Sequence, residues 1–317
     1  MKKTLFRIVL GWTCFLGSFA IAEDEHYLFF SPQMRSSHLK DYSLQEKEAI
    51  EKDLQVVRSV CWTLVPEAKM ERKPLYLATG GAPGSRKTTI LERHMEKEFA
   101  SFPLVYVDPD QRGLKFMVHT YYNRSLCAKV LAESTHYIEA AQRAYEKWRG
   151  SSNYIAVTLL EQAFAQRRDI AHGTTLTGDH VPAFLSKVRE AGYEIVLLLC
   201  SSEDSFREQA VRYRNEEQKF YQSTPEDVVG KWKAFPQKMS TFFAFGDQLY
   251  LFWSDDLETP ERLAAILTYG HIKVCDQEAL DCFMQKFARD RDLLLQEGKQ
   301  VPSWKELVNL YKARFYY

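Results

Sequence analysis

The sequence predicts an α/β fold in which helices flank a parallel sheet. From Pro74 onward, short apolar runs alternate with amphipathic stretches, a pattern typical of strand and helix units in a parallel sheet. A glycine-rich loop joins the first of these apolar runs to a helical stretch. The 42 basic and 42 acidic residues cancel, so no net positive charge favours nucleic acid, and the aromatic content of 14% indicates a folded chain.

The apolar runs and the amphipathic stretches give the order of the expected elements. The expected strands lie at residues 75–79, 104–107, 170–173, 194–199 and 249–253. The expected helices lie at residues 87–99, 112–122, 134–149, 154–167, 181–191, 204–220 and 225–238. Residues 73–256 therefore form the central domain of this prediction.

The N-terminus has the features of a signal peptide, which we predict at residues 1–22. Basic residues between positions 2 and 7 precede an apolar run at residues 8–19 and a small-x-small cleavage site that ends at Ala22. The run is shorter than the roughly 20 residues of a membrane-spanning helix. We expect Sec export to the periplasm or out of the cell. An uncleaved anchor is the alternative, and a cytoplasmic chain is expected only if this segment is no leader.

The segments on either side of the central domain are both expected to be helical. Residues 23–72 form a helical lead-in, in which the Ser-x-x-Glu sequence at residues 43–46 has the pattern of a capping box. Residues 257–317 form a C-terminal helical extension, with a second such pattern at residues 303–306.

The glycine-rich loop is the strongest functional signal in the sequence. The phosphate-binding template G-x-x-x-x-G-K-[ST] is matched by Gly81, Lys87 and Thr88, between an apolar strand and a helix start. In such a loop, backbone N–H groups and the positive helix end face the phosphates of ATP. Lys87 would contact the β- and γ-phosphates, and the Thr88 hydroxyl would be a ligand of Mg²⁺. An ordinary Gly/Pro-rich turn is the alternative.

Nine consecutive residues of this loop and helix start are expected to bind the nucleotide. They are Gly81, Ala82, Pro83, Gly84, Ser85, Arg86, Lys87, Thr88 and Thr89. Arg86 replaces the second glycine of the template, directly beneath the expected phosphates, where a side chain can crowd the anion. The alternatives are that its guanidinium turns outward or adds a positive charge to the site.

Together with the segments that follow, the sequence resembles the zeta-toxin family over roughly residues 74–256. These are P-loop kinases that phosphorylate a sugar hydroxyl of UDP-N-acetylglucosamine. In that family a strand ends in Asp-x-Asp, and the second carboxylate is taken as the base for the acceptor hydroxyl. The resemblance therefore implies a P-loop kinase-like fold and makes Asp110, in Val107-Asp108-Pro109-Asp110, the candidate base. A turn with helix-capping carboxylates is the alternative.

The resemblance also implies substrate-side residues, with departures. The family carries Glu-Gly-Thr after a strand, and this chain has His172, Gly173 and Thr174, so a histidine stands in place of the acid. Glu161 resembles another substrate-side acid of the family, although a solvated helix residue is an equal alternative. These matches make Glu161, His172 and Thr174 the candidate substrate-binding residues.

Arg212 resembles a family arginine that stabilises the transferring phosphoryl group. A planar and permanently charged donor suits that role, and a surface arginine on a charged helix is the alternative. A second family arginine is expected before Thr224, but Gln222 occupies that position and carries no charge.

The sequence therefore predicts a kinase that transfers the γ-phosphoryl of ATP, with Mg²⁺, to a hydroxyl of a nucleotide sugar such as UDP-N-acetylglucosamine. Lys87, Asp110 and Arg212 are its predicted catalytic residues. The partners are ATP and this small molecule, with no nucleic acid, no membrane span after cleavage and an unidentified neutralising or host protein. The alternative is an exported inactive kinase fold that acts as a toxin-like or interaction protein, and a third possibility is a different small alcohol as acceptor.

Overall fold

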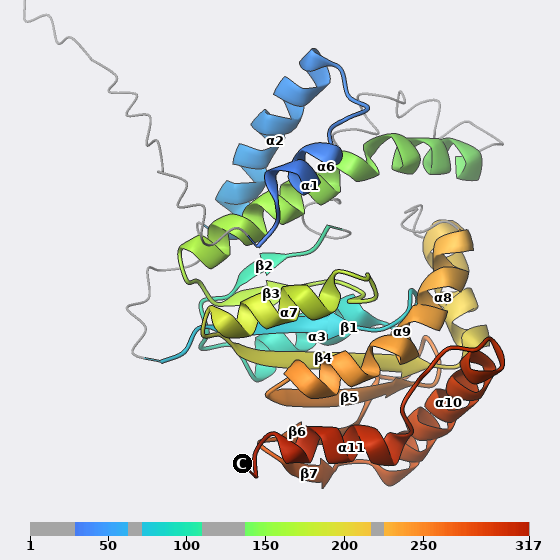
Figure 1. Cartoon of the computed structure of the whole chain (residues 1–317). Coiled ribbons are helices and arrows are strands. Elements are labelled where there is room, and N and C mark those ends of the chain that lie inside the picture. The colour runs from blue at the N-terminus through green and yellow to red at the C-terminus, as the bar shows by residue number, and fades with distance from the viewer. Residues whose placement is uncertain (1–28, 63–71, 110–136, 217–224, 317) are drawn as a thin grey trace, which may run out of the picture.

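The structure is a computed structural model that describes residues 29–62, 72–109, 137–216 and 225–316 (Figure 1). The helices are α1 (Pro32–Ser37), α2 (Leu44–Trp62), α3 (Lys87–Lys97), α6 (Tyr137–Ala165), α7 (Val181–Glu190), α8 (Asp204–Glu216), α9 (Pro225–Phe245), α10 (Gln277–Gln296) and α11 (Trp304–Ala313). The strands are β1 (Leu75–Gly80), β2 (Val105–Val107), β3 (Ile170–His172), β4 (Glu194–Ser202), β5 (Gln248–Ser254), β6 (Arg262–Thr268) and β7 (His271–Val274).

The strands form a single mixed sheet in the order β2-β3-β1-β4-β5-β6-β7. The first five strands in this order are parallel, and β6 and β7 are added antiparallel at the β5 edge. Because the parallel strands point the same way, the loops after β1, β2 and β3 meet at one edge of the sheet. Ligands bind at that edge in open α/β folds.

Both faces of the sheet are buried, which explains the near-continuous apolar runs of its strands. Alternate residues of β1 divide between the faces: Tyr76 packs in a cluster with α6, α7 and α9, whereas Leu75 and Leu77 pack with Ile90 and Leu91 of α3. Figure 1 shows α7 and α9 on the opposite side of the sheet from α3. The expected strands are all observed, with ends shifted by at most a few residues.

The N-terminal lead-in packs on α6. Tyr42 stacks on Trp148 with the ring centroids 5.4 Å apart, and its hydroxyl donates a hydrogen bond to the Lys147 carbonyl at 2.6 Å. The expected capping box at residues 43–46 is present, since the Ser43 N–H donates to Glu46 Oε2 at 2.8 Å. The predicted leader and the expected helix at residues 112–122 lie outside the described residues.

The expectation that residues 257–317 are helical throughout is wrong. Residues 262–274 form strands β6 and β7, and only α10 and α11 are helical in this tail. The sequence of β6, Arg-Leu-Ala-Ala-Ile-Leu-Thr, contains good helix formers, but pairing with the buried strand β5 overrides that preference. The capping box at residues 303–306 is confirmed at the start of α11.

Two expected helices are joined in the structure. The sequence predicts separate helices at residues 134–149 and 154–167. They belong to the single helix α6, in which Gly150 leaves room for the lead-in: a Cβ there would lie 2.6 Å from the His38 carbonyl oxygen. Within the described ranges, none of the helices combines the length and apolar character needed to cross a membrane.

The C-terminal tail contacts helix α8 through charged side chains. Lys286 of α10 is buried and forms an ion pair with Asp204, at the start of α8, at 3.0 Å. Arg207 of α8 is also buried and pairs with the same carboxylate. The tail therefore shares buried polar contacts with the helix that follows β4.

Candidate functional site

The loop after β1 adopts a conformation that requires glycine at two positions. Gly81 has a φ of 147°, and a Cβ there would lie 2.4 Å from the Cys200 carbonyl oxygen. Gly84 has a φ of 85°, and a Cβ there would lie 2.6 Å from the Arg207 carbonyl oxygen. Both glycines therefore allow the loop to approach the backbone of β4 and α8 closely.

The loop turns around the carbonyl oxygen of Ala82. The Ser85 hydroxyl donates to this oxygen at 2.8 Å, and Lys87 Nζ donates to it at 2.6 Å. Helix α3 begins at Lys87, so the positive end of the helix lies where the loop ends. This is the strand–loop–helix arrangement that the phosphate-binding template requires.

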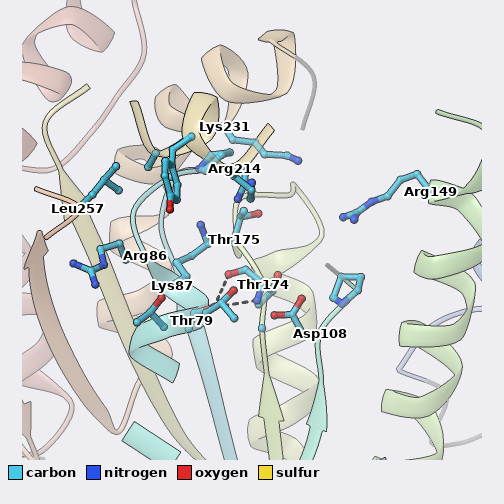
Figure 2. A pocket seen from close by; sticks show the side chains of 18 of the residues that line it. Thr79, Arg86, Lys87, Asp108, Arg149, Thr174, Thr175, Arg214, Lys231 and Leu257 are labelled. Carbon is cyan, nitrogen blue, oxygen red and sulfur yellow. Dashed lines mark hydrogen bonds between the residues drawn. The ribbon is translucent and has the colours of Figure 1, made fainter. Parts of the chain in front are cut away.

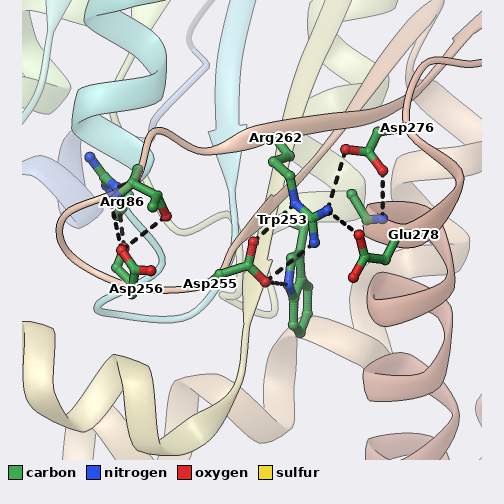
Figure 3. Close-up of polar contacts among 9 residues, drawn as sticks. Arg86, Trp253, Asp255, Asp256, Arg262, Asp276 and Glu278 are labelled. Atoms are coloured by element: carbon green, nitrogen blue, oxygen red, sulfur yellow. Dashed lines mark hydrogen bonds and ion pairs between the residues drawn. The ribbon is translucent and has the colours of Figure 1, made fainter.

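Arg86 faces away from the loop interior. Its φ of 57° is in the left-handed region that favours glycine, so the backbone keeps the conformation of the glycine that it replaces. Its guanidinium donates to the carbonyl oxygen of Asp256 (Figure 3). It also donates to the carbonyl oxygen of Thr259 and lies 3.8 Å from Glu261 Oε2. Of the alternatives for Arg86, the outward orientation is therefore observed.

The phosphate loop forms the floor of a cavity of about 730 Å³ (Figure 2). Of the nine predicted nucleotide-binding residues, six line this cavity: Pro83, Gly84, Arg86, Lys87, Thr88 and Thr89. Gly81, Ala82 and Ser85 lie behind them, where they shape the loop. The opposite wall comes from the loops after β2 and β3, which are neighbouring strands.

Asp108 is a buried carboxylate in this wall, directly after β2. The Tyr106 hydroxyl donates to its Oδ2 at 3.1 Å, and Gly173 leaves the space that the carboxylate fills, since a Cβ there would lie 2.1 Å from Oδ2. The predicted base Asp110 lies outside the described residues. The structure therefore places Asp108, the first carboxylate of the Asp-x-Asp pair, in the cavity wall. The family resemblance implied a role for the second carboxylate, Asp110, and none for Asp108.

His172 and Thr174 lie beside the phosphate loop at the end of β3. The main chain of Thr174 is fixed by Thr79, whose Oγ1 donates to the Thr174 carbonyl at 2.7 Å and accepts from its N–H at 3.0 Å. His172 Nδ1 lies 2.7 Å from the Tyr76 hydroxyl. Burial lowers the pKa of His172 to about 3, so at neutral pH the ring is uncharged and does not replace the negative charge of the family's acid.

Glu161 is neither a solvated residue nor part of the cavity lining. Its side chain on α6 is buried, and its two oxygens accept the main-chain N–H groups of Phe29 and Phe30, both at 3.0 Å. Burial raises the pKa of Glu161, while these two donors act in the opposite direction. The carboxylate therefore fastens the start of the lead-in to α6, and the prediction of substrate binding by Glu161 finds no support in this geometry.

Replacing Glu161 by glutamine is expected to loosen the lead-in. An amide NH₂ group cannot accept a hydrogen bond, so one buried main-chain N–H loses its partner, which costs about 1–3 kcal/mol of unfolding free energy. Urea unfolding and limited proteolysis of the lead-in measure the effect. Glu48→Gln, an exposed change on α2, is the control, and equal stability of the two variants would contradict the assigned role.

Three basic residues from different helices line the cavity. They are Arg149 of α6, Arg214 of α8 and Lys231 of α9 (Figure 2). The predicted Arg212 is exposed and does not line the cavity, whereas Arg214, two residues further along α8, does. The helical spacing from the buried Phe206 would have identified this face, because Ala210 and Arg214 follow it at intervals of four residues.

A second, smaller cavity of about 240 Å³ adjoins the first. The two share Pro109, Arg149, Thr174 and Thr175 as lining residues. The walls of the second cavity are mostly apolar and include Phe30 and Met34 of the lead-in, Leu160 of α6 and Phe184 of α7. Three histidines, His38, His172 and His180, also line it.

The comparisons with known proteins give similarity in structure alone. No protein-family model matches the chain, and no curated protein matches it in sequence. A chain of the native AvrRxo1-ORF1:-ORF2 complex is similar with a TM-score of 0.55 and 16% identity, over 89% of this chain and 93% of that chain. The same complex solved with ATP gives a TM-score of 0.55 and 16% identity, over 89% of this chain and 94% of the other.

A third structure, from the PezAT chromosomal toxin–antitoxin system of Streptococcus pneumoniae, gives a TM-score of 0.45 and 18% identity, over 80% of this chain and 98% of that chain. Similarities at such low identity concern the fold and not the activity. The sheet order, the phosphate loop and the similarity to the AvrRxo1 structures together show that this chain has the P-loop kinase-like α/β fold that its sequence predicted.

Proposed function

We propose that this chain is a phosphotransferase that moves the γ-phosphoryl group of ATP to a hydroxyl of a small alcohol, such as a nucleotide sugar. The observation that carries the proposal is one cavity lined by Lys87 and Thr88 of the phosphate loop and by the Asp108 carboxylate. The AvrRxo1 complex has been solved with ATP, which supports ATP as the donor here. A loop of this type positions phosphates, and phosphoryl transfer depends mainly on positioning and charge stabilisation.

In the proposed reaction, the loop N–H groups and Lys87 bind the triphosphate of ATP. The acceptor hydroxyl loses its proton to the second carboxylate of the Asp-x-Asp pair, which is Asp110 in this sequence. The acceptor oxygen then forms a bond to the γ-phosphorus while the bond between that phosphorus and the bridging oxygen breaks, and ADP leaves with the bonding electrons. Arg214 stabilises the charge on the transferring group.

The residues present fit a Mg²⁺ ion. Mg²⁺ takes one or two protein oxygens and completes its octahedral shell with phosphate oxygens and waters, so it needs no protein cage. The Thr88 hydroxyl and the Asp108 carboxylate line the same cavity and would supply such oxygens. When bound, the ion would neutralise charge on the phosphate groups of ATP.

The proposal is tested by ATP binding and by transfer of labelled phosphate from ATP to UDP-N-acetylglucosamine and to other small alcohols. Lys87→Ala is expected to weaken ATP binding about tenfold to a hundredfold, because it removes a charge-assisted hydrogen bond. Lys97→Ala, an exposed change at the other end of α3, is the matched control. A wild-type chain that binds no ATP and transfers no phosphate would overturn the proposal, and binding without transfer would favour the inactive kinase fold.

We also propose export and a protein partner. The basic start and apolar run of the sequence support cleavage after Ala22, which N-terminal sequencing of the mature chain would test. The AvrRxo1 structures are complexes of two proteins, ORF1 and ORF2, which supports a protein partner for this chain as well. Because ATP is a cytosolic metabolite, an exported kinase would act after delivery into another cell.

A further inference from the structure

The first turn of α8 lies against the phosphate loop. A Cβ at Gly84 would lie 2.6 Å from the carbonyl oxygen of Arg207 and 2.9 Å from its Cα, so the loop contacts the main chain of α8 directly. The same helix carries Arg214, which lines the phosphate-binding cavity. With a rise of about 1.5 Å per residue, Arg214 lies roughly 10 Å further along the helix axis than Arg207. A shift of α8 would therefore displace both the loop and Arg214.

Charged side chains join the start of α8 to α10. Arg207 and Lys286 are each 4% exposed, and both pair with the half-exposed Asp204 carboxylate, Lys286 at a distance of 3.0 Å. Lys286 also pairs with Asp290, which is buried one turn further along α10. Lys286 Nζ lies 5.2 Å from the ring centroid of Trp232 on α9. The network thus contains two cations and two carboxylates and contacts three helices.

The network reaches the back of the phosphate loop. Ala82, Arg207, Lys286 and Asp290 line one small cavity together with the end of β4. None of these four residues lines the phosphate-binding cavity. The carbonyl oxygen of Ala82 accepts the hydrogen bond from Lys87 Nζ, around which the loop turns. The charged groups of α10 therefore lie next to the part of the loop that sets its shape, and on its far side from the phosphates.

Stability alone does not explain charges at this place. Burial removes charged groups from water, and a buried ion pair is often no more stabilising than an apolar pair of the same size. An ion pair can instead fix the relative position of two helices, since a buried charge needs its partner in one particular arrangement. The network is therefore better explained by the position that it gives to α8.

We propose that Lys286 of α10 positions the phosphate loop for ATP, acting through Asp204 and the main chain of Arg207. Lys286 and Arg207 share the Asp204 carboxylate, so Lys286 holds the first turn of α8 where Gly84 can lie against it. Lys286 belongs to the C-terminal tail, beyond the residues that resemble the family. This inference rests on the proposed phosphotransferase function and adds the tail as a determinant of its ATP affinity.

The experiment removes Lys286 from the network without leaving a buried charge unpaired. The double variant Lys286→Met/Asp290→Leu loses one cation and one carboxylate, while Asp204 keeps its pair with Arg207. We therefore expect the urea midpoint of the double variant to stay close to that of the wild-type chain. Its affinity for a non-hydrolysable ATP analogue, measured by calorimetry on the full mature chain, is expected to fall about tenfold, within the range for residues that act on a site from a distance.

Two further variants separate a positioning role from a general effect of changing α10. Lys233→Gln/Glu297→Gln removes an ion pair at the surface between α9 and the end of α10, and its affinity for the analogue should stay within about twofold of the wild type. Lys286→Arg keeps the cation beside Asp204 and should bind the analogue more tightly than the double variant. An affinity of the double variant equal to that of the wild type would overturn the proposal, and so would an equal loss in the surface variant.

Amide hydrogen exchange of residues 81–88 measures the loop without any nucleotide. The double variant should exchange faster there than the wild type and the surface variant, and equal exchange in all three would overturn the proposal. A wild-type chain that does not bind the analogue would count against the phosphotransferase function, whereas exchange in the loop would still test the role of Lys286.

The wild-type chain provides a test that holds even if the double variant does not fold. Coupling between two sites is reciprocal, so the analogue should slow amide exchange at residues 203–208 of α8 and 284–290 of α10. Residues 305–312 of α11, which lie outside the network, serve as the reference. Exchange at residues 284–290 that the bound analogue leaves unchanged would contradict the coupling.

Discussion

Replacing Arg214 by alanine is expected to lower the rate of phosphoryl transfer by about 10³-fold, the lower end of what such arginines contribute. Arg214 lines the phosphate cavity from α8, opposite the loop that holds Lys87. Charge spreads over the equatorial oxygens of the transferring group, and a planar guanidinium stabilises it more in the transition state than in bound ATP. The loss should therefore appear in kcat, with little change in the affinity for ATP.

Arg212→Ala is the matched control, because Arg212 is exposed on the same helix and does not line the cavity. Its removal should change the rate by about twofold or less, as is usual for surface substitutions. Arg214→Lys keeps the charge but loses the planar donor geometry, and an intermediate rate is expected. A large loss in Arg212→Ala with none in Arg214→Ala would instead support the role that the sequence resemblance implied for Arg212.

Acidification from pH 7 to pH 5 is expected to remove about 2 kcal/mol of unfolding free energy for each of two buried histidines. Burial lowers the pKa of His94 to about 4 and that of His172 to about 3, from a model-compound value of 6.5. Between these values and 6.5 the unfolded chain binds more protons than the folded chain. The stabilisation is therefore complete above pH 6.5 and is lost as the pH falls towards 4 for His94 and towards 3 for His172.

His94 offers the cleaner test of this prediction, because it lies on α3 among Phe99, Tyr250 and Phe252, and its Nε2 is 3.1 Å from the Glu98 carboxylate. His94→Phe should lose about 2 kcal/mol less than the wild type between pH 7 and pH 5 in urea unfolding. His271→Gln, a change at an exposed position, is the control. An unaltered pH dependence in His94→Phe would show that the Glu98 carboxylate already compensates the charged ring.

The parallel strands of the sheet could be predicted from the sequence, because strands that are buried on both faces consist of continuous apolar runs. The strand expected at residues 75–79 and the helix expected at residues 181–191 differ from β1 and α7 by a single residue at one end. Strand β6 could not be predicted in this way, because its residues have no strong local preference for a strand. Its conformation is set by pairing with β5, a long-range contact that no local pattern records.

In the candidate site, too, some features follow from the local sequence, whereas others depend on contacts with distant parts of the chain. The phosphate loop could be predicted because its chemistry lies in consecutive residues, with Gly81 and Gly84 at positions of positive φ. The outward turn of Arg86 depends on carbonyl groups about 170 residues away in the chain. Likewise, Glu161 binds main-chain groups of the lead-in, and no spacing along α6 indicates that contact.

The antiparallel pairing of β6 with β5 also covers the edge at which the parallel part of the sheet would otherwise end. A fragment that ended at Asp256, the predicted limit of the central domain, would leave β5 as an open edge with unpaired N–H and C=O groups beside the apolar side chains of Leu249 and Leu251. Such an edge is a template for strand exchange between molecules and for aggregation. The C-terminal tail therefore covers an apolar strand edge that a chain ending at Asp256 would expose.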